Sequence, residues 1–177
     1  MKHESNERSV VVQNNSVTFD QVYDKAYIPR EYEDDIRKAN LLILPEESFR
    51  EEEGLFFPET TREFFEYMKA SEAPELITDI AVSDEDFQKI ELHASIIEVA
   101  TIIIKDYVFP VVLNLVSSFL YDLVKKYHRS PDDTSADVKI IVEETKRKKS
   151  KKIIYKGPVS GVKDTLEKVA EHLFDEE

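Results

Sequence analysis

The sequence contains no cysteine and no tryptophan, and it has only three glycines, Gly54, Gly157 and Gly161. Without cysteine there can be no disulfide bond, no thiol catalysis and no zinc site built on thiolates. The glycines are too scattered to form a phosphate-binding loop, which needs several closely spaced glycines. Residues 1–16 contain no apolar run longer than three residues, so we expect no signal peptide and, with cysteine absent, a cytoplasmic protein.

The chain has enough residues and enough apolar side chains to fold. Its 177 residues are 41% hydrophobic and 34% charged. A chain of this length buries roughly 70% of its extended surface, which supports a core without metal or disulfide links. This composition excludes a wholly disordered protein and a polytopic membrane protein.

The formal net charge of −13 is unevenly distributed along the chain. Residues 1–106 hold 25 acidic and 11 basic residues, whereas residues 107–177 hold 12 acidic and 13 basic residues. An acidic surface repels phosphate backbones and anionic lipid headgroups. We therefore expect no nucleic acid and no membrane to bind the first part of the chain.

The first half of the chain predicts a strand–helix–strand unit. The short apolar run 41–44, ended by Pro45, is typical of a strand buried on both faces. Thr60 and Glu63 have the spacing of a capping box and predict a helix, and residues 76–82 predict the next strand. Two strands joined by a helix favour a parallel pair. After Pro45 we expect a long acidic loop.

Two more capping boxes follow this unit. Ser83 and Asp86 predict a short helix, and Ser95 and Glu98 predict a longer one over residues 96–104. The many β-branched residues of 96–104 leave a strand as the alternative. We prefer the helix because the polar residues recur at helical spacing.

The most apolar segment, residues 96–124, decides the functional interpretation. Pro110 disfavours a helical conformation at Phe109, so we expect a break there and a second helix after it. A membrane span needs about 20 apolar residues, and charged residues interrupt this segment at shorter intervals. Either the rest of the chain covers the helix, or a partner protein or a second copy does. The predicted partner-binding face consists of Phe109, Val112, Leu115, Val116, Phe119 and Leu120.

The C-terminal part predicts a hairpin followed by a helix. Two β-rich runs, residues 138–144 and 151–156, form the strands of the hairpin. The polar residues 129–137 are typical of a linker. We therefore predict an α/β domain over residues 1–128 and a hairpin–helix appendage over residues 138–177.

The tip of this hairpin is strongly basic. Such a tip can contact a phosphate backbone or an acidic partner surface, or it can simply protect the hairpin from pairing with other strands. Nucleic acid is expected to bind, if anywhere, at these residues. The six cations are Lys146, Arg147, Lys148, Lys149, Lys151 and Lys152.

The sequence contains no pattern typical of a catalytic site. The four histidines do not form an HExxH motif, and Ser160 is not the central serine of a GxSxG motif but is placed to cap the last helix. We therefore predict no catalytic residue, no metal ligand and no cofactor. The enzymatic alternative is a divalent cation bound beyond the strand ends. Its carboxylate ligands would come from Glu46, Glu47, Glu51, Glu52, Glu53, Asp84 and Asp86.

Residues 109–174 combine an apolar helix, a short linker, a lysine-tipped hairpin, a Gly157–Pro158 turn and a closing helix. This order resembles small accessory proteins encoded beside effectors in bacterial defence operons. The resemblance implies a non-catalytic component that assembles with an effector, and it transfers no functional residue.

Together these features predict an α/β or α+β fold, with a small mixed sheet, helices on its faces and a C-terminal β-hairpin followed by a helix. The predicted function is a non-enzymatic subunit or adaptor that binds a partner protein or a second copy through its apolar helix. A metal-dependent enzyme and a membrane-associated protein are the alternatives.

Overall fold

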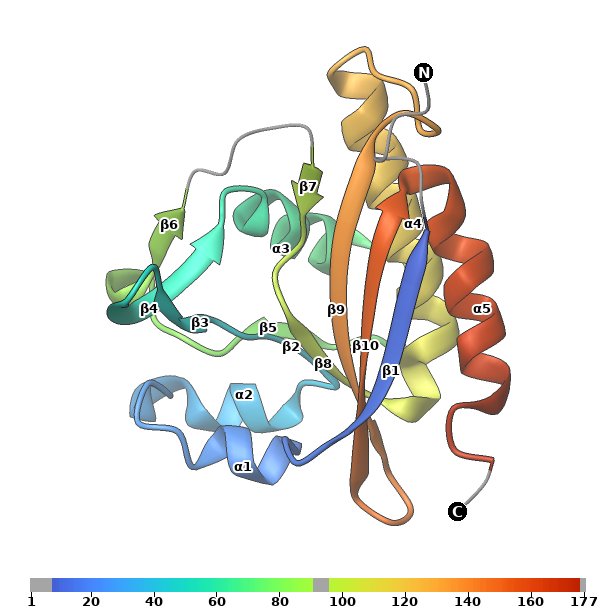
Figure 1. Cartoon of the computed structure of the whole chain (residues 1–177). Coiled ribbons are helices and arrows are strands. Elements are labelled where there is room, and N and C mark those ends of the chain that lie inside the picture. The colour runs from blue at the N-terminus through green and yellow to red at the C-terminus, as the bar shows by residue number, and fades with distance from the viewer. Residues whose placement is uncertain (1–7, 91–95, 176–177) are drawn as a thin grey trace.

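The computed structural model describes residues 8–90 and 96–175, in which helices surround two β-sheets (Figure 1). The predicted mixed α/β fold is confirmed. In spatial order the larger sheet contains β1 (Ser9–Asn15), β10 (Lys149–Pro158), β9 (Ser135–Glu144), β8 (Ile102–Lys105), β2 (Leu41–Ile43) and β5 (Thr78–Ile80), and β7 (Ile96–Glu98) pairs with the start of β9. The smaller sheet contains β3 (Glu46–Phe49), β4 (Glu52–Pro58) and β6 (Gln88–Ile90).

The larger sheet mixes parallel and antiparallel pairs. β2 and β5 run parallel, with Leu41 opposite Thr78, and α3 (Thr61–Ala70) lies between them in the chain. The predicted strand–helix–strand unit is therefore confirmed. β8 runs antiparallel to β2 and parallel to β9, while β10 runs antiparallel to both β9 and β1.

Helices cover the two faces of the larger sheet unequally. α4 (Phe109–Lys126) and α5 (Val162–His172) pack on one face and share the main core with α3. α1 (Phe19–Tyr23) and α2 (Glu33–Lys38) form a second core on the opposite face, where they cover β2 and β8 (Figure 1). In the described part of the chain, no helix lies over the part of that opposite face next to β1 (Figure 1).

Residues 96–104 form strands, so the helix predicted for this segment is wrong. Ile102, Ile103 and Ile104 in β8 are at most 1% exposed, because cores lie on both faces of β8. A strand buried on both faces favours a continuous β-branched run. That preference outweighs the capping-box spacing, whose first residue, Ser95, lies outside the described residues.

Two other predictions for the first half need correction. The segment after Pro45 is not a loop but the hairpin of β3 and β4, whose turn residues Arg50 and Glu51 have φ angles of 49° and 69°. The helix predicted from Ser83 is a single 3-10 turn, Asp84–Asp86, followed by β6. β6 depends on pairing with β4, a distant segment of the chain, and local spacing does not reveal such pairing.

The predicted C-terminal hairpin and closing helix are confirmed as β9, β10 and α5. The hairpin lies inside the larger sheet, and its Val138 and Tyr155 join the same core as α4, so it is not an appendage. Residues 135–137, expected to be linker, are the first residues of β9. The N-cap of α5 is Gly161 rather than Ser160.

Candidate functional site

The helix face predicted to bind a partner lies inside the protein. Of the six predicted residues, Leu115 is half-buried, and those at most 4% exposed are Phe109, Val112, Val116, Phe119 and Leu120. The Phe119 ring packs edge-on against Phe64 of α3 at a centroid distance of 5.2 Å. The interface prediction is therefore corrected, because the chain's own sheet and helices cover this face.

α4 also meets a simple test for a membrane-spanning helix. Residues 106–126 are long and apolar enough to cross a membrane, with a mean hydropathy of 1.6, and 56% of the tested window is buried inside the protein. A core helix of a folded domain meets the same test of length and composition. The packing of α4 against the sheet is that of such a core helix.

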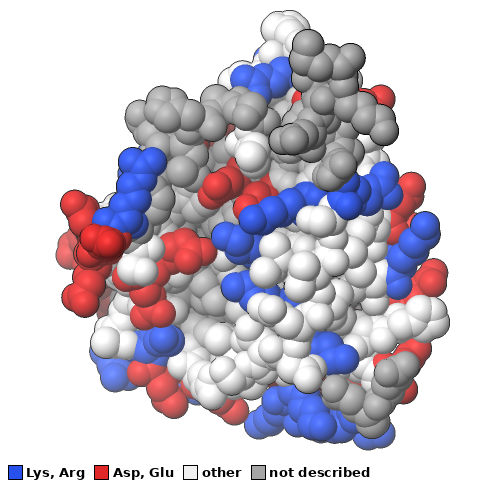
Figure 2. Space-filling model, viewed as in Figure 1, with Lys and Arg blue, Asp and Glu red and all other residues white. Residues whose placement is uncertain are grey.

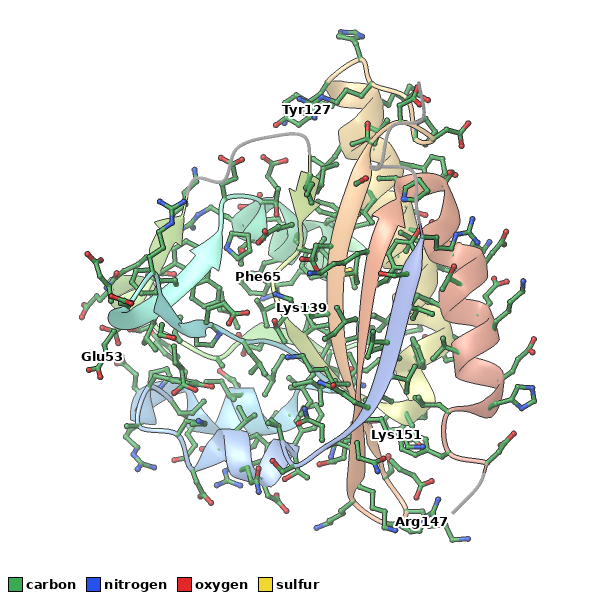
Figure 3. The ribbon with its side chains drawn as sticks, in the orientation of Figure 1. Glu53, Phe65, Tyr127, Lys139, Arg147 and Lys151 are labelled. Atoms are coloured by element: carbon green, nitrogen blue, oxygen red, sulfur yellow. The ribbon has the colours of Figure 1, made fainter. Side chains whose placement is uncertain are left out.

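The basic tip of the β9–β10 hairpin is braced by neighbouring elements (Figure 3). Arg147 donates two hydrogen bonds to the Glu144 carboxylate, and this bonding lowers the pKa of Glu144. Lys151 Nζ donates to the carbonyl oxygen of Leu173, just after α5, at 2.7 Å. The tip therefore has a structural role in holding the end of α5.

The six cations of the tip do not form one uniform surface. Lys148 Nζ lies 3.5 Å from a carboxylate oxygen of Asp20 near the start of α1. The exposed members are Lys146, Lys148 and Lys149, and the half-buried members are Arg147, Lys151 and Lys152. Three of the six residues predicted to contact an anion are therefore only partly exposed.

An acidic hollow of about 410 Å³ lies at the carboxyl end of β5. Burial raises the pKa of Asp79, and the hydrogen bond that the Ile80 N–H donates to Asp79 Oδ1 at 2.8 Å opposes this shift. The carboxylates that line the hollow belong to Glu31, Asp35, Asp79, Asp84 and Glu85. Of the predicted metal ligands, only Asp84 lies here.

The other predicted metal ligands lie elsewhere. Glu46 and Glu47 of β3 lie 3.9 Å and 3.1 Å from the ammonium groups of Lys139 and Lys25. Asp86 accepts a hydrogen bond from Ser83, and Glu51, Glu52 and Glu53 are exposed at the β3–β4 turn, where Figure 3 labels Glu53. Across residues 8–90 and 96–175, no three acidic or histidine side chains are grouped so that they could hold a metal ion.

β7 and β9 bring together two carboxylates that the sequence analysis did not connect. Glu98 is the register partner of Asp137. Burial raises the pKa of Glu98, repulsion from Asp137 raises it further, and Lys139 opposes the shift. Asp137 Oδ1 is buried and has no hydrogen-bond partner in the described part of the chain. Because the pKa of Glu98 is raised, we expect the stability of the sheet to depend on pH.

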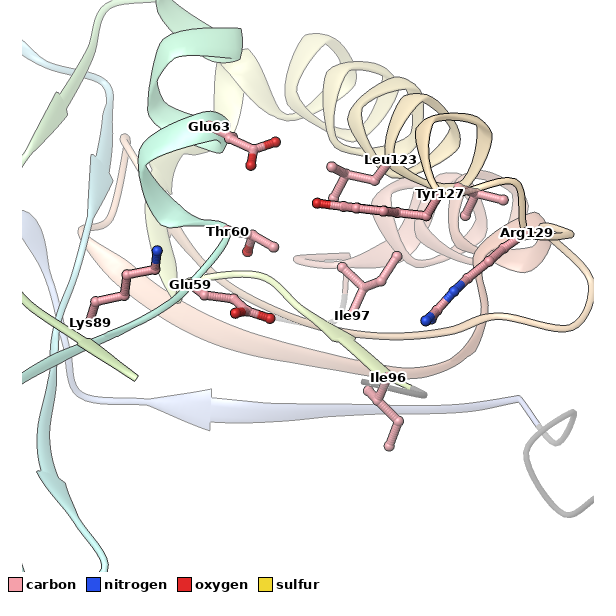
Figure 4. A pocket seen from close by; sticks show the side chains of 10 residues that line it. Glu59, Thr60, Glu63, Lys89, Ile96, Ile97, Leu123, Tyr127 and Arg129 are labelled. Carbon is pink, nitrogen blue, oxygen red and sulfur yellow. The ribbon is translucent and has the colours of Figure 1, made fainter. Parts of the chain in front are cut away.

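A second hollow, of about 340 Å³, opens between the start of α3, β7 and the end of α4 (Figure 4). The Thr60 hydroxyl donates to the carbonyl oxygen of Glu98 at 2.7 Å, so it ties α3 to β7 instead of capping the helix. Leu123 and Tyr127 face the hollow from α4, and Glu63 lies on the opposite side (Figure 4). Apolar and charged side chains are mixed here, which suits an amphipathic group, but among the described lining residues no nucleophile is paired with a base.

The outer edge of β1 is a surface that the sequence analysis missed. β1 pairs with β10 on one side, and within the described ranges no strand pairs with its other side. Val10, Val11 and Val12 are 39%, 50% and 43% exposed. Edge strands usually carry charges, prolines or bulges that prevent pairing with other chains. The seven residues of β1 include none of these features.

β1 is firmly attached to the sheet on its inner side. Its seven residues pair in continuous register with β10, from Ser9 opposite Lys156 to Asn15 opposite Ser150. The Ser150 hydroxyl also donates to the carbonyl oxygen of Asn15 at 3.0 Å. The outer edge of β1 therefore belongs to a regular strand, whose outward N–H and C=O groups can form main-chain hydrogen bonds with another strand.

Charge is distributed unevenly around this edge. Register places Gln13 opposite Lys152 and Ser9 opposite Lys156, so lysines of β10 border β1 on the uncovered face of the sheet. Acidic side chains gather mainly over the smaller sheet, on the left of Figure 2, whereas basic side chains cross the face of the larger sheet. The outer edge of β1 thus lies away from the main concentration of negative charge.

Comparisons with protein-family models, with curated proteins and with solved structures found no match. The candidate functional site therefore rests on the geometry of this chain. Of the surfaces described above, the outer edge of β1 departs furthest from the usual design of a folded protein.

Proposed function

We propose that the protein is a non-enzymatic assembly subunit that binds another protein chain by strand addition at β1. The single observation that carries this proposal is the uncharged, regular outer edge with its three exposed valines. In strand addition, main-chain hydrogen bonds supply affinity, and contacts of alternating side chains supply specificity. The proposal keeps the predicted adaptor role but moves its contact from α4 to β1.

The resemblance of residues 109–174 to accessory proteins of bacterial defence operons supports this class of function. Such a component assembles with an effector and needs no catalytic residues of its own. On this proposal the partner supplies an extended segment with β-branched side chains that match Val10 and Val12.

The proposal can be tested with the full chain expressed in its native host. The substitution Val11→Lys places a charge at the centre of the edge, and Ile77→Lys is the matched control, because Ile77 is 49% exposed but lies outside the strands. We expect hydrogen exchange of the β1 amides to slow in the assembly recovered with the wild-type protein. Val11→Lys should abolish that assembly and Ile77→Lys should preserve it. An assembly that forms equally with Val11→Lys, or that leaves the β1 amides unprotected, would contradict the proposal.

A further inference from the structure

We infer that the chain occupying the outer edge of β1 is a second copy of this protein, paired antiparallel around Val11. This inference rests on the proposed function and names its partner. Two copies related by a two-fold axis perpendicular to the sheet would join their larger sheets into one continuous sheet. Such an interface uses the same residues from both copies, so every contact occurs twice.

The sequence of β1 favours one register over the others. With Val11 on the two-fold axis, Val11 faces Val11 of the other copy, Val10 faces Val12, and Ser9 faces Gln13. Each valine then has a valine opposite, and such β-branched cross-strand pairs are the favourable ones. Shifting the axis by one residue to Val12 would place Val10 and Val11 opposite Asn14 and Gln13, which loses these apolar pairs.

The main chain of β1 also fits a second copy. In an antiparallel ladder, alternate residues direct their N–H and C=O groups to opposite sides of the strand, so β1 keeps half of these groups for its outer edge. A second β1 in the proposed register presents the same groups in the reversed direction. Strand and partner therefore have the same length and the same spacing of donors and acceptors.

Electrostatic repulsion does not oppose this pairing despite the net charge of −13 on each copy. Ser9–Asn15 contains no charged residue, so no like charges face each other across the axis. The lysines that lie opposite β1 residues, Lys151, Lys152 and Lys156, belong to β10. In the joined sheet three strand spacings, about 14 Å, would separate them from the β10 lysines of the other copy. That distance exceeds the screening length of about 8 Å at physiological ionic strength.

The size of the contact sets its expected strength. An edge of seven residues on each side buries less surface than the roughly 1,200 Å² at the lower limit of a standard stable interface. We therefore expect a reversible dimer with a dissociation constant in the micromolar range. The uncharged edge also predicts that raising the salt concentration changes this constant little.

The absence of cysteine allows a direct test of the register. Val11→Cys would place two sulfur-bearing residues opposite each other, with Cα atoms about 4.5–5.5 Å apart, which suits a disulfide. Val12→Cys would leave the corresponding Cα atoms about 8 Å apart, which is too far. Ile77→Cys is the control for random collision, because this residue is equally exposed but distant from β1 in the chain. We expect mild oxidation to link Val11→Cys faster than either of the others.

Sedimentation velocity over a range of protein concentrations provides the second readout. We expect the cysteine-free wild-type chain to dimerise and Val11→Lys to raise the dissociation constant at least about tenfold, because like charges directly opposite each other are destabilising. The thermal unfolding midpoint of Val11→Lys, measured in parallel, should stay close to that of the wild type because the side chain is half exposed.

The two proposals fail in different ways. A wild-type chain that stays monomeric, or a Val11→Cys variant that is linked no faster than Ile77→Cys, overturns the second-copy inference. Binding of a different protein at β1 would then still support the assembly function. Faster linking of Val12→Cys than of Val11→Cys overturns the register.

Discussion

At the residue scale, one buried ion pair connects three elements. The Glu143 side chain of β9 is 3% exposed and pairs with Lys105 of β8. It also accepts a hydrogen bond from the Phe19 N–H at the start of α1, at 2.9 Å. The ammonium group of Lys105 lies 4.3 Å from the centroid of the Phe19 ring. Glu143 therefore links the sheet to the helices on its second face.

Glu143→Ala should destabilise the protein by about 3–5 kcal/mol, because it leaves the Lys105 charge partly buried without its partner. The matched control is Lys38→Ala, which removes an exposed pair with Asp35 and should change stability by less than about 1 kcal/mol. Urea unfolding measures both free energies. Equal effects of the two substitutions would show that Glu143 is not a structural link.

The pH dependence of stability should report the Glu98–Asp137 pair. The folded-state pKa of Glu98 is raised above its ordinary value by burial and by Asp137, so the folded state binds a proton more readily than the unfolded state. Ionisation of Glu98 therefore costs stability as pH rises from the ordinary glutamate pKa through the raised one. Glu98→Gln should raise the thermal unfolding midpoint at pH 7 and lose this advantage near pH 4. A gain of the same size at both pH values would contradict this assignment.

At the element scale, the close approach of Arg8, just before β1, to β10 and to the start of α5 depends on two glycines. A Cβ atom at Gly157 would lie 2.9 Å from the Arg8 Cα and 3.0 Å from the Tyr155 hydroxyl, whereas a Cβ at Gly161 would meet the flexible end of the Arg8 side chain. The Tyr155 hydroxyl is itself held by a hydrogen bond to the carbonyl oxygen of Pro158 at 2.6 Å. The main chain at Arg8, just before β1, therefore has little room to move at Gly157.

Gly157→Ala should loosen β1, since overpacking of this kind costs typically 1–3 kcal/mol. Hydrogen exchange of the β1 amides should accelerate more than that of β8, which lies in the middle of the sheet. Gly161→Ala should have the smaller effect, because the Arg8 side chain can move away from the added methyl group. Similar exchange in both variants and the wild type would contradict the proposed packing.

Elements whose signal is local could be predicted from the sequence, and elements defined by distant pairing could not. The strand at Leu41–Ile43, the helix α4 and the C-terminal hairpin all carry their own apolar pattern. The break expected at Phe109 was wrong, because Phe109 is the first residue of α4 and Pro110 fits in its first turn. Residues 96–104 carry both a helical spacing and a β-branched composition, and the strands on either side of β8 decide between them. The three valines of β1 are β-branched residues typical of a strand, but their position at the edge of the sheet depends on where β10 lies.

At the scale of the whole molecule, the arrangement of layers determines which apolar residues are available for binding. α4 is the most apolar helix, yet the sheet and neighbouring helices cover it. The exposed apolar residues of β1 are fewer, but they lie where the sheet can be extended. The amount of apolar sequence alone therefore predicts the core of this protein and not the contact surface that we propose at β1.

This distinction predicts opposite effects of two substitutions. Leu120→Ala in α4 should lower the free energy of unfolding by about 2–5 kcal/mol and leave dimerisation of the folded chain unchanged. Val11→Lys in β1 should weaken dimerisation and leave the free energy of unfolding nearly unchanged. Urea unfolding and sedimentation, performed on both variants, give the comparison. A loss of dimerisation in folded Leu120→Ala would assign the contact to α4 after all.

The topology of the larger sheet also bears on how the chain reaches its folded state. β1 is the first strand, yet its inner neighbour β10 is among the last elements, and the bonded residues Asn15 and Ser150 are 135 positions apart. During synthesis β1 cannot pair with β10 until β10 has left the ribosome. Pairing across such a large separation is slow and leaves the early strand exposed to wrong partners. Nascent chains on neighbouring ribosomes could therefore meet through β1 before either chain has completed its own sheet.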